Sequence, residues 1–370
     1  MIARDDIIIR KAILHILDTM HGQCILSNTL LDPGPDLYEF IRNHIYKIVV
    51  SDDTKDCEFN PETSPIYPIL TAWDESDEES FIATSQAIAE KLYTSMGEGL
   101  DIPAADLLFV TFQAEGVIYL ALLKMNYKES YTHEISVSDI PAAGVFSDTD
   151  IESDTDVSSG AASKEEPATT EIRADIVKSR ALLPASGTRI PEAIIIKLDD
   201  MHIKLLEKRY EVNGEKVFYL SENFLVCHTS LPPKRKLNIL TKVINTISNK
   251  YDGADLKTKM DTKSALQKEY VDRQSFDVEE IGNRLFGNSP EKKSEFDEKM
   301  EQYDLQFDNF TVTNESTVKK LEKQIMVTDS GIEISIPMET YNKLANLEVQ
   351  TDVTGKTTII IKNIDNLILK

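Results

Sequence analysis

The chain has 370 residues, with 40 Lys and Arg against 63 Asp and Glu, and carries a formal net charge of −23. Hydrophobic residues make up 41% of it, which allows a sizeable core and excludes a wholly disordered or collagen-like protein. The acidity excludes a protein that coats nucleic acid with its whole surface, because phosphate binding needs a positive face.

The cysteines and the lack of long apolar runs exclude further classes of protein. Cys24, Cys57 and Cys227 lie far apart, which argues against a disulfide framework or a cysteine-based zinc site and fits a reducing cytoplasm. No apolar run reaches the roughly 18 residues of a membrane span. The first ten residues contain acids and no small-residue cleavage site, so we expect neither a membrane segment nor a signal peptide.

Paired apolar runs of strand length mark the first block, residues 1–139. Each pair flanks a short link that contains glycine, a pattern typical of antiparallel strands. The runs are 12–18 and 23–27 around Met20-His21-Gly22, then 106–113 and 117–127 around Ala114-Glu115-Gly116.

Two helices are expected in the same block. Residues 36–48 and 81–96 have apolar side chains at i, i+3 and i+4, the spacing of an amphipathic helix. Asp36 is a plausible cap of the first helix, and Gly97 is expected to end the second. The acidic stretch 51–80 is expected to loop over the surface.

Residues 140–190 differ in composition and are predicted to be an acidic, Ser/Asp-rich linker or insertion. The part 146–171 reads FSDTDIESDTDVSSGAASKEEPATTE and holds eight acids and one lysine. Such a sequence buries too little apolar surface to offset the entropy lost on ordering.

Strand-like patterns resume over 191–231. Residues 193–198 and 216–226 are rich in apolar and β-branched side chains, and Asn213-Gly214 is a turn signal. Residues 202–210 fit either a strand or a short helix. We expect this part to complete the sheet of the first domain.

From residue 232 the spacing of apolar residues changes from that of a strand to that of a helix, which predicts a helical middle over 232–323. Strand-like runs return in a small C-terminal unit over 324–370. The unit is expected to be strand, turn, strand, short helix and hairpin. Helices are expected at 237–247, 257–271, 276–286 and after Ser289-Pro290, a connector at 308–318, strands at 324–328, 332–336, 347–351 and 357–362, and a short helix at 338–345.

These elements predict an α+β fold. It has an N-terminal mixed or antiparallel sheet with packed helices, then the helical middle, then the small strand-helix-hairpin unit. Sequentially adjacent strands in short hairpins favour antiparallel pairing.

Motifs of enzyme chemistry are missing from the sequence. The triplet Gly355-Lys356-Thr357 lacks the earlier glycine and the following helix of a phosphate-binding loop, so a hairpin turn is the expected structure. His15 and His44 lie in apolar patterns typical of core histidines, and His133 has no nucleophile motif beside it. No metal-ligand pair, nucleophile elbow or dinucleotide fingerprint occurs. We therefore expect no catalytic residue and no metal.

Basic residues gather in the helical middle, where their sign is opposite to that of the chain. A local excess of positive charge suits phosphate, because affinity follows local rather than total charge. A solubilising surface of mixed charge is the alternative. Tyr127 and Tyr131, with Lys124 and Lys128, form a second, weaker candidate site. The principal candidates are Lys234, Arg235, Lys236, Lys242, Lys250, Lys257, Lys259, Lys263 and Lys268, followed by Arg273.

At this point the layout resembles the bacterial 37-kDa nucleoid-associated protein family, nearly end to end except for the acidic segment. The order and spacing of several segments carry the resemblance. These are 12–31 (AILHILDTMHGQCILSNTLL), 106–131 (DLLFVTFQAEGVIYLALLKMNYKESY), 218–231 (FYLSENFLVCHTSL), 328–337 (TDSGIEISIP) and 357–364 (TTIIIKNI). The resemblance implies a cytoplasmic, DNA-binding protein found with the bacterial nucleoid, without enzymatic activity or cofactor.

Three hypotheses follow, and the third, an enzyme such as a metal-dependent hydrolase that uses carboxylates, has no motif behind it. In the first, the chain binds the backbone of double-stranded DNA, or of single-stranded nucleic acid, through its basic helices and without strong sequence specificity. In the second, it is an acidic adaptor that binds topoisomerases or other chromosome-handling proteins and reaches DNA only indirectly. A homodimer fits either of the first two hypotheses, because the helical middle has apolar stripes that need a partner or a core.

Overall fold

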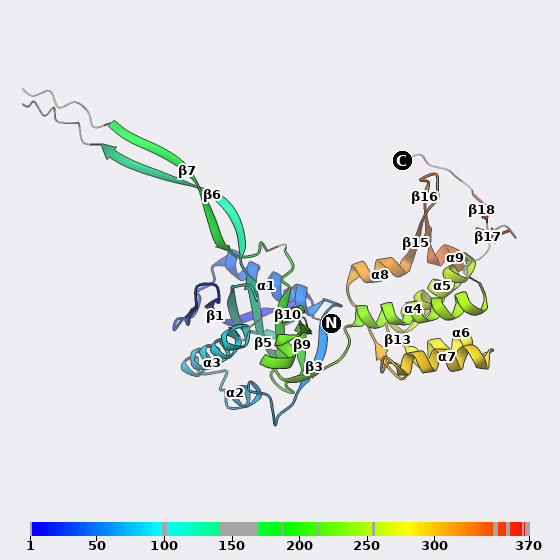
Figure 1. The fold of residues 1–370 in the computed structure, drawn as a ribbon, viewed down its shortest axis with the longest axis horizontal. Coiled ribbons are helices and arrows are strands. Elements are labelled where there is room, and N and C mark those ends of the chain that lie inside the picture. The colour runs from blue at the N-terminus through cyan, green and yellow to red at the C-terminus, as the bar shows by residue number, and fades with distance from the viewer. Residues whose placement is uncertain are drawn as a thin grey trace, which may run out of the picture.

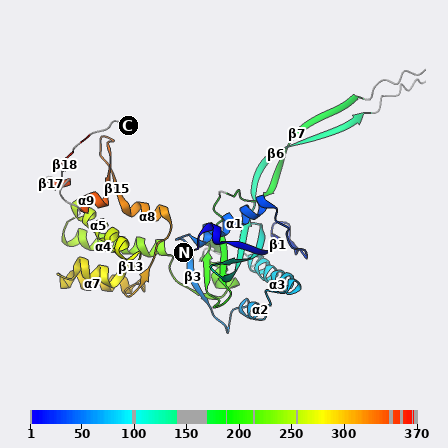
Figure 2. The same ribbon diagram turned by 180° about the vertical axis from the view of Figure 1, so that it is seen from behind.

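The structure, a computed structural model, describes residues 2–97, 102–140, 169–186, 188–212, 215–253, 256–342, 347–352, 356–364 and 366. It has an N-terminal lobe built on a sheet and a helical lobe joined to it, so the predicted α+β class is confirmed (Figure 1). A long two-stranded arm extends from the N-terminal lobe, as the view from behind also shows (Figure 2).

Within the described residues, the N-terminal lobe contains three α-helices and most of the strands. Its strands are β1 (Ile8–Asp18), β2 (Gln23–Ile25), β3 (Lys55–Phe59), β4 (Ala105–Ala114), β5 (Val117–Asn126), β6 (Lys128–Ile140), β7 (Thr169–Leu182), β8 (Glu192–Lys197), β9 (Ile203–Leu206), β10 (Tyr210–Val212), β11 (Glu215–Val217) and β12 (Cys227–Thr229). Its helices are α1 (Pro35–Val49), α2 (Tyr67–Thr71) and α3 (Glu78–Gly97), with short helical turns at Arg4–Asp6 and Leu220–Phe224.

The helical lobe follows, together with the C-terminal hairpins. Its helices are α4 (Pro233–Tyr251), α5 (Leu256–Arg273), α6 (Val278–Phe286), α7 (Pro290–Glu301), α8 (Glu315–Glu322) and α9 (Met338–Asn342). Its strands are β13 (Phe276–Asp277), β14 (Asn309–Phe310), β15 (Lys323–Val327), β16 (Glu333–Pro337), β17 (Leu347–Thr351) and β18 (Thr357–Ile361).

One eight-stranded sheet organises the N-terminal lobe. Its order is β12-β3-β9-β8-β5-β4-β1-β2, and every neighbouring pair is antiparallel. The predicted hairpin of β4 and β5 lies inside it, turning at Glu115 (φ 50°) and Gly116 (φ 81°). Positive φ at both central residues matches the twist of the flanking strands. As predicted, β8, β9 and β12 continue this sheet.

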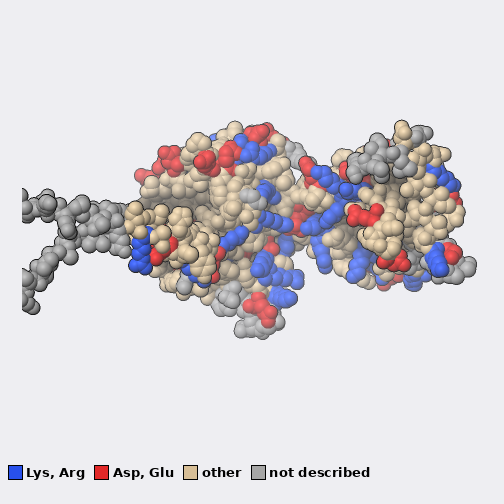
Figure 3. All heavy atoms as spheres, turned by 90° about the horizontal axis from the view of Figure 1, so that it is seen from above, with Lys and Arg blue, Asp and Glu red and all other residues tan. Residues whose placement is uncertain are grey.

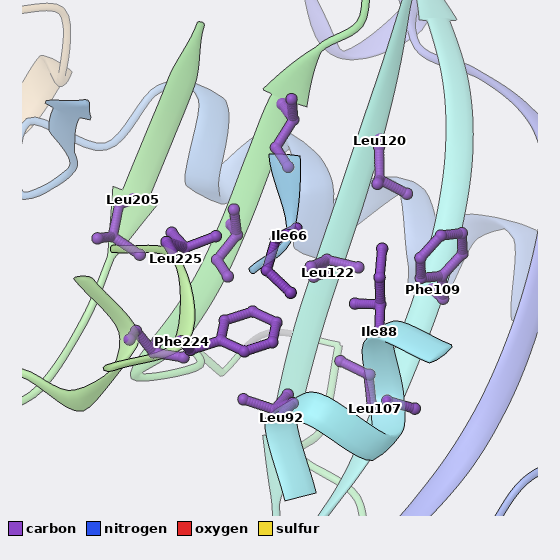
Figure 4. Close-up of a cluster of buried hydrophobic side chains, with 14 of the residues drawn as sticks. Ile66, Ile88, Leu92, Leu107, Phe109, Leu120, Leu122, Leu205, Phe224 and Leu225 are labelled. Atoms are coloured by element: carbon purple, nitrogen blue, oxygen red, sulfur yellow. The ribbon is translucent and has the colours of Figure 1, made fainter. Parts of the chain in front are cut away.

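Both faces of the sheet are covered. Leu107 and Phe109 of β4 point to the α3 side, where they pack with Ile88 and Leu92 (Figure 4). The intervening residues of β4 point to the α1 side and belong to a second buried cluster. This alternation with period two explains why almost every side chain of β4 is buried, as expected for a central strand between two helical layers.

The acidic stretch 51–80 differs from its prediction as a surface loop. It contains β3, which lies between β9 and β12 in the sheet, and α2. Cys57 and Phe59 of β3 are buried while Glu58 between them is exposed. This alternation predicts a strand, and the surrounding acids concealed it.

Two local predictions need correction. Helix α1 begins one residue earlier than predicted, with Gly34 at the cap position and Asp36 in the first turn, so Asp36 is not the cap. Its carboxylate still suits the positive end of the helix. Within 216–226, β11 ends at Val217 and a helical turn covers Leu220–Phe224, where one strand was predicted. Burial of Leu220 and Phe224 in the core favours the turn.

The segment predicted as linker or insertion, 140–190, contains β7 at Thr169–Leu182. β7 pairs antiparallel with β6, from Lys128 opposite Leu182 to Ile140 opposite Thr169. Residues 141–168, the most acidic part of the prediction, lie outside the described residues.

The helical lobe has its own core of side chains from α4 to α8. The four predicted helices correspond to α4, α5, α6 and α7, with Gly287 and Ser289 at the predicted boundaries. The connector predicted at 308–318 includes β14 and the first turn of α8. The predicted tail hairpins are confirmed as β15–β16 and β17–β18, although the turn around Gly355 lies outside the described residues.

Close packing of α6 on α7 gives a test of this core. A Cβ at Gly282 would lie 2.5 Å from Cε1 of the fully buried Phe296. We expect Gly282→Ala to destabilise the helical lobe by about 1–3 kcal/mol, because the buried ring has to move. Urea unfolding followed by far-UV circular dichroism measures the effect. Gly97→Ala at the end of α3, where a Cβ meets nothing within 4 Å, is the control. An equal, small effect of both substitutions would contradict the packing argument.

Candidate nucleic-acid interface

Helix α4 has two faces of opposite character. Leu240, Ile244 and Ile247 are fully buried in the helical core. Around the other side, polar residues recur every three or four positions and form one wall of a groove; they are Lys234, Asn238, Thr241, Lys242, Asn245 and Asn249. Pro233 at the first helical position needs no hydrogen-bond acceptor, so the helix and its polar face start there.

The groove, which we call the lysine groove, lies between α4, α5 and α8 and has a volume of about 640 Å³. Helix α5 contributes a second wall with Lys259, Met260 and Lys263, and α8 closes one end with Thr317 and Lys320. Leu237 and Leu266 form part of its floor, so the lysines stand on an apolar base.

Charge in the lysine groove has one sign. Five lysines line it, Lys234, Lys242, Lys259, Lys263 and Lys320, and none of its described lining residues is acidic. The side chains of Lys242, Lys259 and Lys320 are exposed and make no ion pair within the described part of the chain. Their charge is therefore available to a ligand.

Lys263 is the most enclosed of the five. Its Nζ donates to the backbone oxygen of Lys323 at 2.9 Å and to Oε1 of Gln324 at 3.1 Å. Burial lowers the pKa of this ammonium group. Lys263 thus ties α5 to the start of β15 and fixes one end of the groove.

Four of the nine residues proposed from the sequence line the groove together. These are Lys234, Lys242, Lys259 and Lys263. Arg235 and Lys268 are exposed, but they lie outside it.

Three other candidates have carboxylate partners outside the groove. Lys236 is largely buried and pairs with Asp308 at 2.8 Å. Lys250 pairs with Glu295 at 2.6 Å, and Lys257 pairs with Asp261 at 2.9 Å. Arg273 lies beside the carboxylates of Glu269 and Glu280.

Sequence reasoning missed Lys320. It lies in a run with Lys319 and Lys323, and these three line a smaller hollow next to the groove together with Lys263. Three lysines in five residues are a readable signal of local positive charge, but they lie beyond the basic region that ends at Arg273.

The second candidate, around Lys124 and Lys128, was wrong as a single site. Lys124 is 2% exposed, and its Nζ donates to Glu192 at 2.8 Å and to Asn126 at 2.6 Å. Tyr127 donates its hydroxyl to Asp106 at 2.7 Å. Lys124 therefore belongs to the interior of the lobe, and Tyr127 is half-buried with its hydroxyl engaged.

Contacts at the junction of the lobes set the position of the groove. Asp52 accepts hydrogen bonds from the backbone N–H groups of Thr313 and Asn314, just before α8. Lys234 Nζ lies 3.0 Å from Asp53, which also binds Arg189. Burial alone would raise the pKa of Asp53, but these two partners bring it below its usual value. Figure 3 shows lysine and arginine gathered on both sides of the junction.

Comparison with known proteins then gives the family. A family model described as nucleoid-associated protein YejK matches residues 13–368. The chain belongs to this nucleoid-associated protein family. The resemblance inferred from the segment order is confirmed. Comparison with curated proteins gives no match.

The cysteines, histidines and helices of this member of the nucleoid-associated protein family were also considered in the sequence predictions. Within the described residues, no cluster of three or more His, Cys, Asp and Glu side chains could hold a metal ion. The three cysteines are free thiols. Among the helices that the structure describes, none is long and apolar enough to cross a membrane. His15 and His44 are buried, as predicted.

Proposed function

We propose that the chain is a non-catalytic nucleoid-associated protein that binds the DNA backbone through the lysine groove, without strong sequence specificity. The observation that supports this is the all-positive groove in a chain of net charge −23. Each lysine is a point charge suited to phosphate. The acidic remainder of the surface repels DNA and confines the contact to the groove. The place of action would be the bacterial nucleoid in the cytoplasm.

The polar side chains of the groove favour backbone contacts over base reading. Asn238, Asn245 and Thr241 can donate hydrogen bonds to phosphate oxygens. Among the described lining residues there is no Phe, Tyr or Trp, so the groove offers no platform on which bases stack. We therefore propose duplex DNA as the ligand, with single-stranded nucleic acid as the weaker one.

Charge reversal in the groove tests the proposal. We expect Lys242→Glu, Lys259→Glu and Lys320→Glu together to weaken duplex binding by about 100-fold or more at low salt, because three phosphate contacts become repulsive. For contacts by the three unpaired lysines, the wild-type affinity should fall roughly 40-fold between 50 and 200 mM salt, since each contact releases counterions. Fluorescence anisotropy with duplexes of unrelated sequence measures affinity, salt slope and specificity.

A matched variant controls for the change in net charge. Lys91, Lys216 and Lys356 are exposed, lie outside the groove and make no ion pair within the described residues. Their triple reversal to glutamate changes the charge equally and should change the affinity by less than about threefold, through long-range repulsion alone. Equal losses in both variants, or no binding of wild type at low salt, would refute the groove as the DNA site.

The adaptor hypothesis remains the second candidate because of the acidic surface outside the groove. It predicts that chromosome-handling proteins such as topoisomerases copurify with the chain after nuclease treatment. Loss of those proteins on nuclease treatment supports direct DNA binding.

A further inference from the structure

The arm formed by β6 and β7 lacks the support that a β-ribbon normally needs. It extends away from the N-terminal lobe, and neither strand joins another sheet among the described residues (Figures 1 and 2). An isolated pair of strands is at best marginally stable in water, and a third layer or strand is usually required.

One face of the arm is mostly apolar and exposed. Residues directly opposite in the register share a face, which places Tyr131, Ile135, Ile172, Ala174 and Ile176 together, with His133 opposite Ile176 and Lys178 opposite Tyr131. Tyr131 is 70% exposed, Ile135 60%, Ile172 71% and Ile176 80%. We call Tyr131, Ala174 and the three isoleucines the apolar arm face. An exposed apolar patch of this kind marks an interaction surface.

The opposite face is polar. Thr132, Glu134 and Ser136 lie across from Val177, Asp175 and Arg173. The arm is thus amphipathic with period two, like a strand pair in a sheet with one solvated face. Only one of its two faces calls for a partner.

The two halves of the arm carry opposite charge, so the charge favours a partner whose two halves carry the opposite signs in the same order. Residues 128–133 and 176–182, at the root, contain three Lys or Arg and one acid, whereas residues 134–140 and 169–175, toward the tip, contain four acids and one Arg. The connecting segment 141–168 adds seven acids and one lysine, a composition that DNA would repel. A second arm laid antiparallel places acidic half against basic half.

We propose that the apolar arm face is a self-association surface, on which the arms of two copies pack face to face and antiparallel. A twofold axis would pass near the middle of the arm, where Ile135 and Ile176 lie. The interface is then isologous, and each copy contributes the same residues. Because the arm projects from its lobe, the two acidic bodies lie well beyond a Debye length of about 8 Å from each other.

The first test is the mass of the full-length chain by light scattering, after nuclease treatment. Wild type is expected to be a dimer, and Ile135→Glu/Ile176→Glu to have the 41.7 kDa monomer mass, because four carboxylates would meet at the axis. Thr132→Glu/Val177→Glu adds the same charge to the polar face and should remain dimeric. A monomeric wild type, or a dimer that survives the Ile135/Ile176 substitutions, overturns the proposal.

A cross-link decides the case in which both charged variants are monomeric. Ala174 faces the proposed partner near the axis, whereas Ser136 points to the other face. Under an oxidant, Ala174→Cys should form a disulfide-linked dimer through loss of two thiol hydrogens, and Ser136→Cys should show only the wild-type background of the native cysteines. No linked species from Ala174→Cys, or equal linkage from both variants, would also overturn the arrangement.

Discussion

Replacing Lys124 with methionine is expected to destabilise the N-terminal lobe by about 3–5 kcal/mol, because it leaves a buried carboxylate without its countercharge. Lys124 and Glu192 are 2% and 0% exposed, and their charged groups lie 2.8 Å apart. Burial lowers the pKa of Lys124, although Glu192 opposes that effect. The Tyr210 hydroxyl also donates to Glu192 at 2.8 Å, so one carboxylate organises β5, β8 and β10.

Unfolding in urea, followed by tryptophan fluorescence, measures this loss of stability in the N-terminal lobe. Trp73 is the single tryptophan of the sequence, and its ring packs 5.9 Å from Phe109 in the N-terminal core. The double variant Lys124→Met/Glu192→Gln should recover most of the stability, because no unpaired charge remains. Lys128→Met removes an exposed lysine a few residues away and should change stability by about 0.5 kcal/mol or less. A double variant no better than Lys124→Met would contradict the charge argument.

Elements with a local pattern could be predicted from the sequence. The stripes of α3 and α4 and the β4–β5 hairpin depend on neighbours within a few residues, so periodicity and the Glu115-Gly116 turn identified them. β3 has the same kind of pattern in Cys57 and Phe59, but it is only five residues long and surrounded by acids. Its place in the sheet depends on β9, whose Ile203 lies opposite Cys57 from far along the chain.

For the candidate site, the sequence could predict only which region is rich in lysine, and not which lysines lie together. Sequence shows where lysines are dense, but the partners that occupy them are remote: Lys236 pairs with Asp308, and Lys250 pairs with Glu295. The groove also needs Lys320 from α8, which no local pattern links to α4 and α5. In the same way, the arm pairs residues on both sides of an acidic segment, so its apolar face becomes visible only when β6 and β7 are in register.

Acid is expected to destabilise the N-terminal lobe through His15, by up to about 3 kcal/mol between pH 6.5 and 4. Burial lowers the pKa of His15 from 6.5 to about 4. The side chain is fully buried, with its Nε2 3.0 Å from Ser85 Oγ and its Nδ1 accepting the N–H of Ser27 at 3.1 Å. In this pH range the unfolded chain binds a proton that the folded chain does not. Stability from His15 is therefore complete above pH 6.5 and is lost as the pH falls.

Two histidine substitutions of opposite expected sign isolate this effect. His15→Gln should reduce the loss of unfolding free energy between pH 7 and pH 4.5, measured by Trp73 fluorescence. His202 Nε2 lies 3.1 Å from Asp56, and that hydrogen bond raises the pKa of His202. The folded state therefore takes up the His202 proton more readily than the unfolded state, which adds stability as the pH falls. Hence His202→Gln should make the acid loss larger. If both variants lost stability with pH in parallel with wild type, neither histidine would control the acid response.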